Sequence, residues 1–357
     1  MRFFKRNYKW IVWSAVIILL AAFMMIPLPL YSETPGISVG LKNFIKVDNK
    51  RPDFKGEYSL TAVTISQLTG LGALITLANP HADFMSKEQV TAGATSSEEQ
   101  KIDQIDMKTA FNNAKAVALQ KANVPYHENF NGVYVRSLQA NSKFKKDLQI
   151  GDMITEINGK KQSSVTDFQN TIRSSKLGQP LTITYVRNHK QYNSTHPTVS
   201  LSTTDEKIPG IGIILIDHTT ISTKPKITAD MGKIGGPSGG LMFSLELYET
   251  LSHQNLAQGR LISGTGTIDR EGNVGEIGGI DKKVISAGES GAKIFFAPYL
   301  KVPSKYLKYE EKHQTNYQLA LKTAKKYEPQ LKIVPVSNFQ QALDYLETHP
   351  VKKESKE

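Results

Sequence analysis

The most pronounced hydrophobic pattern in the chain is an apolar run from Trp10 to Leu30 that contains no charged residue. Its 21 residues are enough for a helix to cross a hydrocarbon core of roughly 30 Å. Four basic residues precede the run (Arg2, Lys5, Arg6 and Lys9), and the first charge after it is Glu33. Because basic residues stay on the cytoplasmic side, this pattern predicts a single-pass membrane anchor with the rest of the chain outside the cell.

A cleaved signal peptide is the competing interpretation of this run. Its apolar region would normally span about 7–15 residues and end at a site of small residues. The run here is longer, and the prolines Pro27 and Pro29 make the following segment a poor cleavage site. We therefore favour a retained anchor.

The pattern beyond the anchor alternates between strand-like and helix-like segments. After a linker at Pro35 and Gly36, residues 56–65 alternate in polarity as a strand does, and residues 71–79 form a short apolar run. The polar residues 86–104 suggest a loop. From Met107 to Ala122 the apolar residues fall on one helical face, which predicts a helix packed against a core.

Short strand-like segments and turn signals dominate residues 131–175. A turn at Gly151-Asp152 and a hairpin signal at Asn158-Gly159 are followed by an amphipathic helix and a closing strand over residues 177–190. In this order the signals resemble a PDZ domain of the bacterial protease type, over residues 128–202. The resemblance implies that Gly132, Val133, Tyr134 and Val135 line a groove where a peptide adds a strand to the sheet.

Length and composition limit the classes of function. The 357 residues suit about two domains, and the absence of cysteine excludes disulfides, thiol catalysis and Cys-ligated zinc. The net charge of +11 is accompanied by no recognisable nucleic-acid-binding module, so no nucleic-acid partner is expected. The eight histidines show no metal-ligand spacing, and no Walker A motif is present. We expect no metal, no cofactor and no ATP-driven step.

One serine lies in an unusual setting. Ser238 is surrounded by Gly235, Gly236, Pro237 and Gly239, and apolar residues at helical spacing follow. The serine therefore lies at the entrance of a helix, where backbone N–H groups are free and the helix dipole is positive. A serine among glycines is more often only a helix cap in a turn, so a catalytic role requires a base.

Two kinds of base are available in the sequence. His218 and His253 flank the serine, but neither lies in a motif. Lys282 and Lys283 follow a second pair of glycines at the start of another predicted helix, and a lysine can act as a base if burial lowers its pKa. Residue type alone leaves both alternatives open.

Three motifs follow one another in this part of the sequence: "GGPSGG", then "ISGTGTIDREGNVG", then "GEIGGIDKKVISA", with Lys283 lying 45 residues after Ser238. Their order and spacing resemble the proteolytic domain of Lon proteases, which are Ser-Lys peptidases of the S16 type. The resemblance implies that Ser238 is the nucleophile, Lys283 the general base and Thr265 the residue that steadies the amine. It also implies that the turn of Gly235, Gly236, Pro237 and Gly239 forms the oxyanion site. Gly239 departs from the alanine common in that family.

An anchor, a PDZ domain and a Lon-type domain without an ATPase together resemble the membrane-anchored Lon-like proteases of Gram-positive bacteria, some of which mature secreted signal peptides. The expected fold is α+β, with the PDZ domain inserted into a discontinuous protease domain. The expected segments are a cytoplasmic segment (1–9), the anchor (10–30), two protease parts (40–127 and 204–348), the PDZ domain (128–202) and a charged tail (349–357).

The function implied is that of an ATP-independent extracellular serine endopeptidase that hydrolyses secreted or surface peptides and proteins. Lon-type domains commonly assemble into rings, so a homo-oligomer is implied as well. The alternative is a peptide-binding adaptor whose PDZ domain acts on an inactive Lon-like scaffold. The complete set of Ser238, Lys283 and Thr265 argues against that alternative.

Overall fold

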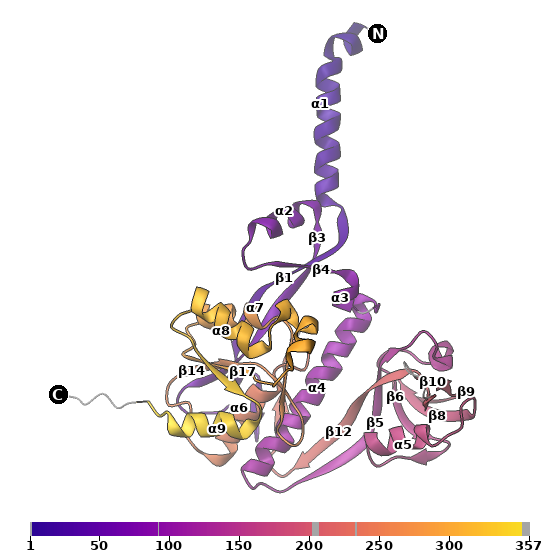
Figure 1. Ribbon diagram of the computed structural model, residues 1–357, viewed down its shortest axis with the longest axis vertical. Helices are drawn as coiled ribbons and strands as arrows, with labels where there is room; N and C mark the ends of the chain where they lie inside the picture. The colour runs from indigo at the N-terminus through magenta and orange to yellow at the C-terminus, as the bar shows by residue number, and fades with distance from the viewer. Residues whose placement is uncertain (1, 92, 202–206, 233, 352–357) are drawn as a thin grey trace, which may run out of the picture.

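A computed structural model describes residues 2–91, 93–201, 207–232 and 234–351. The expected boundary at residues 202–204 and most of the expected tail (349–357) lie outside these ranges. The chain begins with helix α1 (Arg2–Met25), which projects from the rest of the molecule in Figure 1. Residues Asn7–Met25 are long and apolar enough to cross a membrane, and none of that stretch is buried in the protein.

The expected anchor is too long at its C-terminal end. Helix α1 ends at Met25, and strand β1 (Pro27–Gly40) begins two residues later. Pro27 has no N–H to continue the helical hydrogen bonds, and Pro29 repeats the restriction. The segment expected to be a linker at Pro35 and Gly36 is also part of β1.

The larger sheet has six strands in the order β18-β17-β14-β3-β1-β4. β3 runs antiparallel to β1 and parallel to β14, and β17 and β18 continue the parallel part. The sheet therefore combines strands that come before and after the predicted PDZ segment. The other bounds are β3 (Glu57–Thr69), β4 (Asp83–Ser86), β14 (Leu261–Gly264), β17 (Ile294–Pro298) and β18 (Lys332–Val336).

Helices cover this sheet and share its core. The helices are α4 (Ser96–Lys121), α6 (Gly240–Ser252), α7 (Ile280–Glu289), α8 (Asn316–Tyr327) and α9 (Phe339–Thr348). The largest apolar cluster joins residues from both halves of the chain, with Met107 of α4 and Leu241 of α6 among its members. Every residue of α6 from Gly240 to Glu249 is buried, so this helix lies at the centre of the domain.

Residues 86–104, expected to be a loop, are largely helical. Helix α3 (Lys87–Thr91) and the first turns of α4 occupy this segment. The Thr95 side chain caps α4 by accepting a hydrogen bond from the Glu98 N–H, and the Glu98 carboxylate accepts one from the Thr95 N–H. Ile102 and Ile105 are buried, so the start of α4 has a narrow apolar face although most of its residues are polar. The apolar run at 71–79 is also a helix, α2 (Gly70–Ala78).

The second sheet has the order β12-β5-β6-β8-β9, with β7 paired to β6. Together with α5 (Val165–Arg173) it encloses its own apolar core, which includes Val133, Phe168 and Ile183. This sheet continues past residue 202 to Thr223, because β12 pairs with β5 along its whole length. The strands are β5 (Tyr126–Leu138), β6 (Met153–Ile157), β7 (Lys160–Lys161), β8 (Pro180–Arg187), β9 (Lys190–Pro197) and β12 (Ile213–Thr223).

Short elements complete the description. They are η1 (Leu41–Asn43), β2 (Ile45–Val47), η2 (Lys143–Lys146), β10 (Val199–Ser200), β11 (Pro209–Gly210), β13 (Ile227–Ala229), β15 (Thr267–Ile268), β16 (Val274–Gly275), η3 (Ser304–Tyr309) and η4 (Glu311–His313).

Ion pairs join the second sheet to the domain that contains the larger sheet. Arg136 of β5 pairs with Asp106 of α4, and Arg270 pairs with Asp217 and Glu128.

Candidate functional site

Ser238 and Lys283 lie in contact although 45 residues separate them in sequence. Ser238 is just before α6, and Lys283 is in the first turns of α7. The Lys283 Nζ is 3.0 Å from the Ser238 Oγ, a distance at which the hydroxyl can donate to a neutral amine. This is the geometry that a nucleophile and its base require.

Thr265 connects these two residues. Its Oγ1 is 3.4 Å from the Lys283 Nζ and donates a 3.2 Å hydrogen bond to the Ser238 carbonyl oxygen. The same carbonyl accepts a 2.8 Å bond from the Gly266 N–H. The Thr265 side chain is fully buried, so its rotamer is held by packing as well. The hydroxyl is thereby in position to orient the amine toward Ser238.

Burial changes the acid–base behaviour of Lys283. Its side chain is only 4% exposed and forms no ion pair among the described residues. Desolvation lowers its pKa from 10.5 to about 8, while Glu33 and Glu311 act weakly in the opposite direction. A substantial neutral fraction is therefore present near pH 8, as general-base chemistry requires.

The neighbouring Lys282 has a different environment. It is also buried, but its Nζ pairs with Asp83 and lies 2.8 Å from the Asp281 carboxylate. Lys312 pairs with the same two carboxylates. Of the two consecutive lysines, only Lys283 is free of carboxylate partners and adjacent to the serine, so the structure distinguishes residues that sequence spacing alone does not.

The turn around Ser238 offers donors for a negatively charged oxygen. The Gly236 N–H already donates to the Asp103 carbonyl at 2.9 Å, and Pro237 has no N–H. Within the described ranges, the N–H groups of Ser238 and Gly239 have no acceptor. These two groups are therefore available at the start of α6, where the helix dipole favours negative charge, whereas Gly236 and Pro237 of the predicted turn offer no free N–H.

Gly239 has a packing reason to lack a side chain. A Cβ at this position would lie 3.0 Å from the Phe243 ring and 3.6 Å from a Leu60 methyl group. An alanine here would push on the Phe243 ring, which packs edge-on against Phe111. A glycine at position 239 therefore agrees with the packing in this protein.

The two histidine alternatives lie elsewhere. His218 is in β12, where it contacts Tyr134 and Met153 in the second sheet. His253 caps the far end of α6, roughly 20 Å along the helix from Ser238 at 1.5 Å per residue. Neither histidine is in contact with the serine.

A cleft of about 530 Å³ opens at the dyad. One wall is the Leu60–Ile65 part of β3, and Asp103 and Met107 of α4 form another. β14 pairs with β3 only as far as Leu60, so the rest of this edge of β3 has no partner strand among the described residues. The Thr61 Oγ1, in this wall, is buried without a hydrogen-bond partner there. An extended peptide could use both features.

The predicted peptide groove in the second sheet requires a correction. Val133 and Tyr134 pair with β12 on one side and with β6 on the other, so the strand from Gly132 to Val135 has no free edge. The edge strand is β12, and a groove of about 240 Å³ lies between it and α5. Its lining includes Gln169 and Arg173 of α5 and the segment 209–215.

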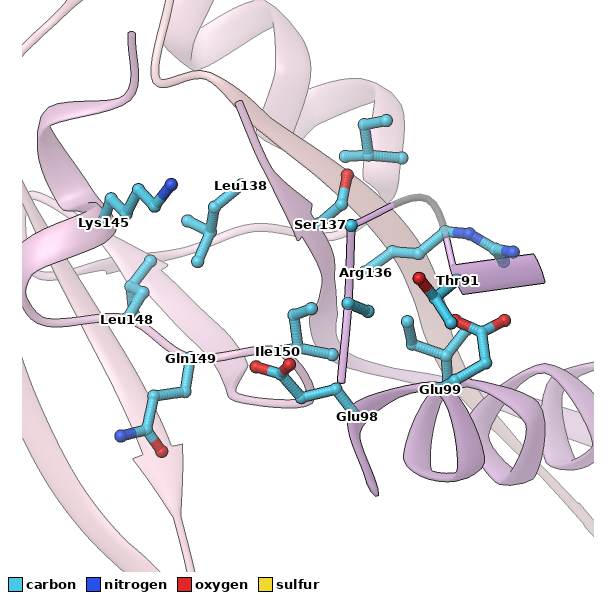
Figure 2. Close-up of a pocket in the computed structure, with 14 residues that line it drawn as sticks. Thr91, Glu98, Glu99, Arg136, Ser137, Leu138, Lys145, Leu148, Gln149 and Ile150 are labelled. Carbon is cyan, nitrogen blue, oxygen red and sulfur yellow. The ribbon is translucent and has the colours of Figure 1, made fainter. Parts of the chain in front are cut away.

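A further pocket of about 420 Å³ lies where the second sheet meets α4. Figure 2 shows Glu99 and Arg136 near one side of this pocket and Lys145 and Leu148 near the other. Neither Ser238 nor Lys283 is in its lining. The pocket is part of the junction between the two units and not of the dyad site.

One group of carboxylates has the spacing of a cation site. Oxygen atoms of Glu33, Asp83 and Glu311 lie within 4.8 Å of one another. The ammonium groups of Lys282 and Lys312 already pair with Asp83. These lysines supply the positive charge that a metal would otherwise bring.

Comparison with known proteins identifies one part of the chain. Residues 100–195 match the family model described as "PDZ domain". The PDZ domain of an SdrC-like protein from Listeria monocytogenes is 32% identical, covering 25% of this chain and 90% of that one, with a TM-score of 0.24. The corresponding domain from Listeria innocua is also 32% identical, covering 24% of this chain and 96% of that one, with a TM-score of 0.23. No curated protein matches the chain.

The matched residues include strands β5 to β9 and helix α5, which form the core of the second sheet. The predicted PDZ domain is thereby confirmed, whereas the strand expected to line its groove, Gly132 to Val135, has no free edge. The chain therefore contains a PDZ domain, a module that binds peptides or proteins, within a mixed α/β protein.

Proposed function

We propose that this protein is an ATP-independent serine endopeptidase of the Lon-like type, with Ser238 as nucleophile and Lys283 as general base. The observation that carries this proposal is the 3.0 Å contact between a serine at a helix entrance and a buried lysine without a carboxylate partner. A structural lysine in such a position would be expected to pair with an acid, as Lys282 does.

The proposed reaction begins when the neutral Lys283 amine takes the Ser238 proton and Oγ attacks the peptide carbonyl carbon. The resulting oxyanion accepts hydrogen bonds from the free N–H groups of Ser238 and Gly239, each worth roughly 3–4 kcal/mol in well-studied hydrolases. The Lys283 ammonium then gives its proton to the leaving amine. Lys283 next takes a proton from a water molecule, whose oxygen attacks the acyl carbon. The bond to the Ser238 oxygen breaks, Lys283 gives the proton back to that oxygen, and the carboxylic acid product leaves the free serine and the neutral amine.

We further propose that the substrate lies extended along the unpaired edge of β3. This edge borders the cleft that contains Ser238 and Lys283, and it begins where β14 ends. Backbone hydrogen bonds along a sheet edge select an extended conformation and tolerate many side chains. Folded proteins would need to present an unfolded segment, because nothing in the sequence suggests an ATP-driven unfolding module.

Helix α1 supports a proposal about the location of the protein. We propose that α1 crosses the cell membrane and that the chain beyond Pro27 lies outside the cell. The support is the apolar stretch Asn7–Met25 with basic residues before it. Protease added to intact cells should digest the chain, and a mature N-terminus beyond Pro29 would contradict the retained anchor.

A second candidate function is that of a peptide-binding adaptor. The presence of a PDZ domain with an open edge at β12 favours it independently of the dyad. Incubation of the wild-type protein and Ser238→Ala with labelled casein and with a fluorophosphonate probe distinguishes the two. The endopeptidase predicts cleavage and labelling that both disappear in the variant. The adaptor predicts neither in the wild type.

A further inference from the structure

Helix α2 exposes most of its apolar side chains. It contains no charged residue, and only Gly70 and Thr76 are buried. Leu71, Leu74, Ile75 and Leu77 are 50%, 54%, 62% and 72% exposed. In a water-soluble domain a helix of this composition would be expected to bury one face, so α2 lacks a partner for most of its surface.

The position of α2 is fixed by its contact with α1. A Cβ added at Gly70 would lie 2.8 Å from the Phe23 carbonyl oxygen and 3.1 Å from the Met24 Cα. The first turn of α2 therefore packs directly on the last turn of the membrane-spanning candidate. Figure 1 shows α2 beside the lower end of α1, between that helix and the body of the protein.

Charged residues are absent from the chain segments that form α2 and its connections to α1 and β3. No Asp, Glu, Lys or Arg occurs from Tyr58 to Pro80, or between the end of α1 and Glu33. The side chains of Met25, Ile26 and Leu30 are exposed here as well. Exposed apolar side chains thus continue from α1 onto β1 and α2, and no charged residue interrupts these segments.

We propose that α2 is a second membrane contact, lying in the interface of the same bilayer that α1 crosses, with lipid acyl chains covering Leu71, Leu74, Ile75 and Leu77. This inference rests on the proposed membrane anchor. The apolar stretch of α1 ends at Met25, and α2 packs at that level, where an apolar helix would meet the boundary between head groups and acyl chains.

The tether explains how so short a helix can bind lipid. Independent interfacial helices usually have a basic face that is attracted to anionic lipids, and α2 has none. Attachment to α1 holds α2 at the surface at a high effective concentration, so modest apolar burial suffices. The contact of α2 with lipid would fix the orientation of the larger domain relative to the membrane, because β3 connects α2 directly to the cleft. Of the β3 residues that line the cleft, Ile65 would lie nearest the membrane.

The natural absence of cysteine makes a direct test practical. Single cysteines are introduced into the full chain at Ile75 of α2, Leu19 in the middle of α1, and Gln191 of β9, which lies far from α1 in Figure 1. Each protein is labelled with an environment-sensitive fluorophore and reconstituted into vesicles of phosphatidylcholine and phosphatidylglycerol. Brominated lipid in the same vesicles then quenches only labels that touch acyl chains. Leu77→Cys serves as a second site on α2.

We expect the Leu19 and Ile75 labels to lose much of their fluorescence to brominated lipid and the Gln191 label to keep it. Quenching at Leu19 without quenching at Ile75 and Leu77 would overturn the proposal while leaving the anchor intact. A blue-shifted Ile75 label that brominated lipid does not quench would show protein cover, such as a second copy of the chain, and would also overturn it. Loss of quenching at Leu19 would refute the anchor itself.

Discussion

Lys282 and Lys283 are consecutive residues of α7, yet only Lys282 pairs with carboxylates, while Lys283 contacts the Ser238 hydroxyl. A helix directs adjacent side chains about 100° apart, so one lysine faces the acidic cluster and the other faces the cleft. This relationship assigns different roles to two residues of the same type.

The two lysines should therefore respond differently to substitution. Lys283→Met and Lys283→Arg should both abolish cleavage of labelled casein, because neither side chain can take a proton at neutral pH. Lys282→Arg keeps the positive charge beside Asp83 and Asp281 and should retain most activity. Equal loss in Lys282→Arg and Lys283→Arg, with both proteins folded by circular dichroism, would contradict the assignment.

The pH profile should have an ascending limb, on its acid side, set by Lys283. Burial lowers its pKa to about 8, and only the neutral amine is a base, so activity should rise with pH and level off above this value. Below it, the rate should fall about tenfold per pH unit. An initial-rate profile of peptide cleavage from pH 6 to pH 10 measures the limb. A limb centred near pH 6.5 would indicate a histidine instead.

The same burial should reduce stability. Between pH 8 and pH 10.5 the unfolded chain binds the Lys283 proton and the folded chain does not, so stability should rise with pH in that window. At pH 7 the desolvation of the Lys283 ammonium lowers the free energy of unfolding by on the order of 3 kcal/mol. Lys283→Met should therefore be inactive yet more resistant to urea than the wild type at pH 7. A less stable Lys283→Met protein would show that the lysine is a structural contact.

Glu246 is a second buried ionisable group whose titration should affect stability. It is fully buried in α6, and no hydrogen bond of good geometry reaches its carboxylate among the described residues. Burial raises its pKa from 4.5 to about 8, so the folded protein holds a proton that the unfolded chain loses. Stability should consequently fall as pH rises from 4.5 to 8. Urea titrations at pH 5 and pH 8 should show a smaller fall for Glu246→Gln than for the wild type.

The PDZ groove can be tested through a glycine at its edge. Gly212 has a φ of 65°, and a Cβ there would lie 2.8 Å from the Ser142 Cβ. Gly212→Val should disturb the start of β12 and weaken peptide binding. Gly178→Val is a matched control, because Gly178 also has positive φ (78°) but has open space around it and lies outside the groove. Phage-display selection on the wild type supplies a peptide, and fluorescence polarisation compares its affinity for the three proteins.

Cleavage of a short peptide should survive Gly212→Val if the PDZ domain only recruits substrate, because remote binding contributes more to positioning than to bond breaking.

In the binding experiment, equal affinity of the Gly212→Val and Gly178→Val proteins for the selected peptide would contradict the groove assignment. So would loss of binding in both.

The sequence predicted some features well because they are local. The Ser238 turn, the PDZ turns at Gly151 and Asn158, and the apolar N-terminal helix depend on neighbouring residues alone. The capping box of Thr95 and Glu98 is equally local, and it is the sequence signal that marks the observed start of α4.

Other features depend on contacts between distant residues. Asp83, which holds Lys282, is 199 residues away in sequence, so no spacing rule separates Lys282 from Lys283. The free edge of β12 was missed because its pairing with β5 joins segments on opposite sides of the expected domain boundary. Gly210 and Gly212 alternate with isoleucines just before β12, and this pattern is the sequence signal that indicates the start of the groove between β12 and α5.

The most direct test of the proposed dyad is to identify the residue that a fluorophosphonate probe modifies. Wild-type protein, Ser238→Ala, Lys283→Ala and the double variant of His218→Ala with His253→Ala are incubated with the probe at pH 8, with or without EDTA, and digested for peptide mapping by mass spectrometry. We predict that the wild type and the double histidine variant are labelled at Ser238 and cleave casein, regardless of EDTA, whereas Ser238→Ala and Lys283→Ala do neither. Labelling and full cleavage by Lys283→Ala, or their loss in the histidine variant or with EDTA, would contradict the Ser-Lys dyad.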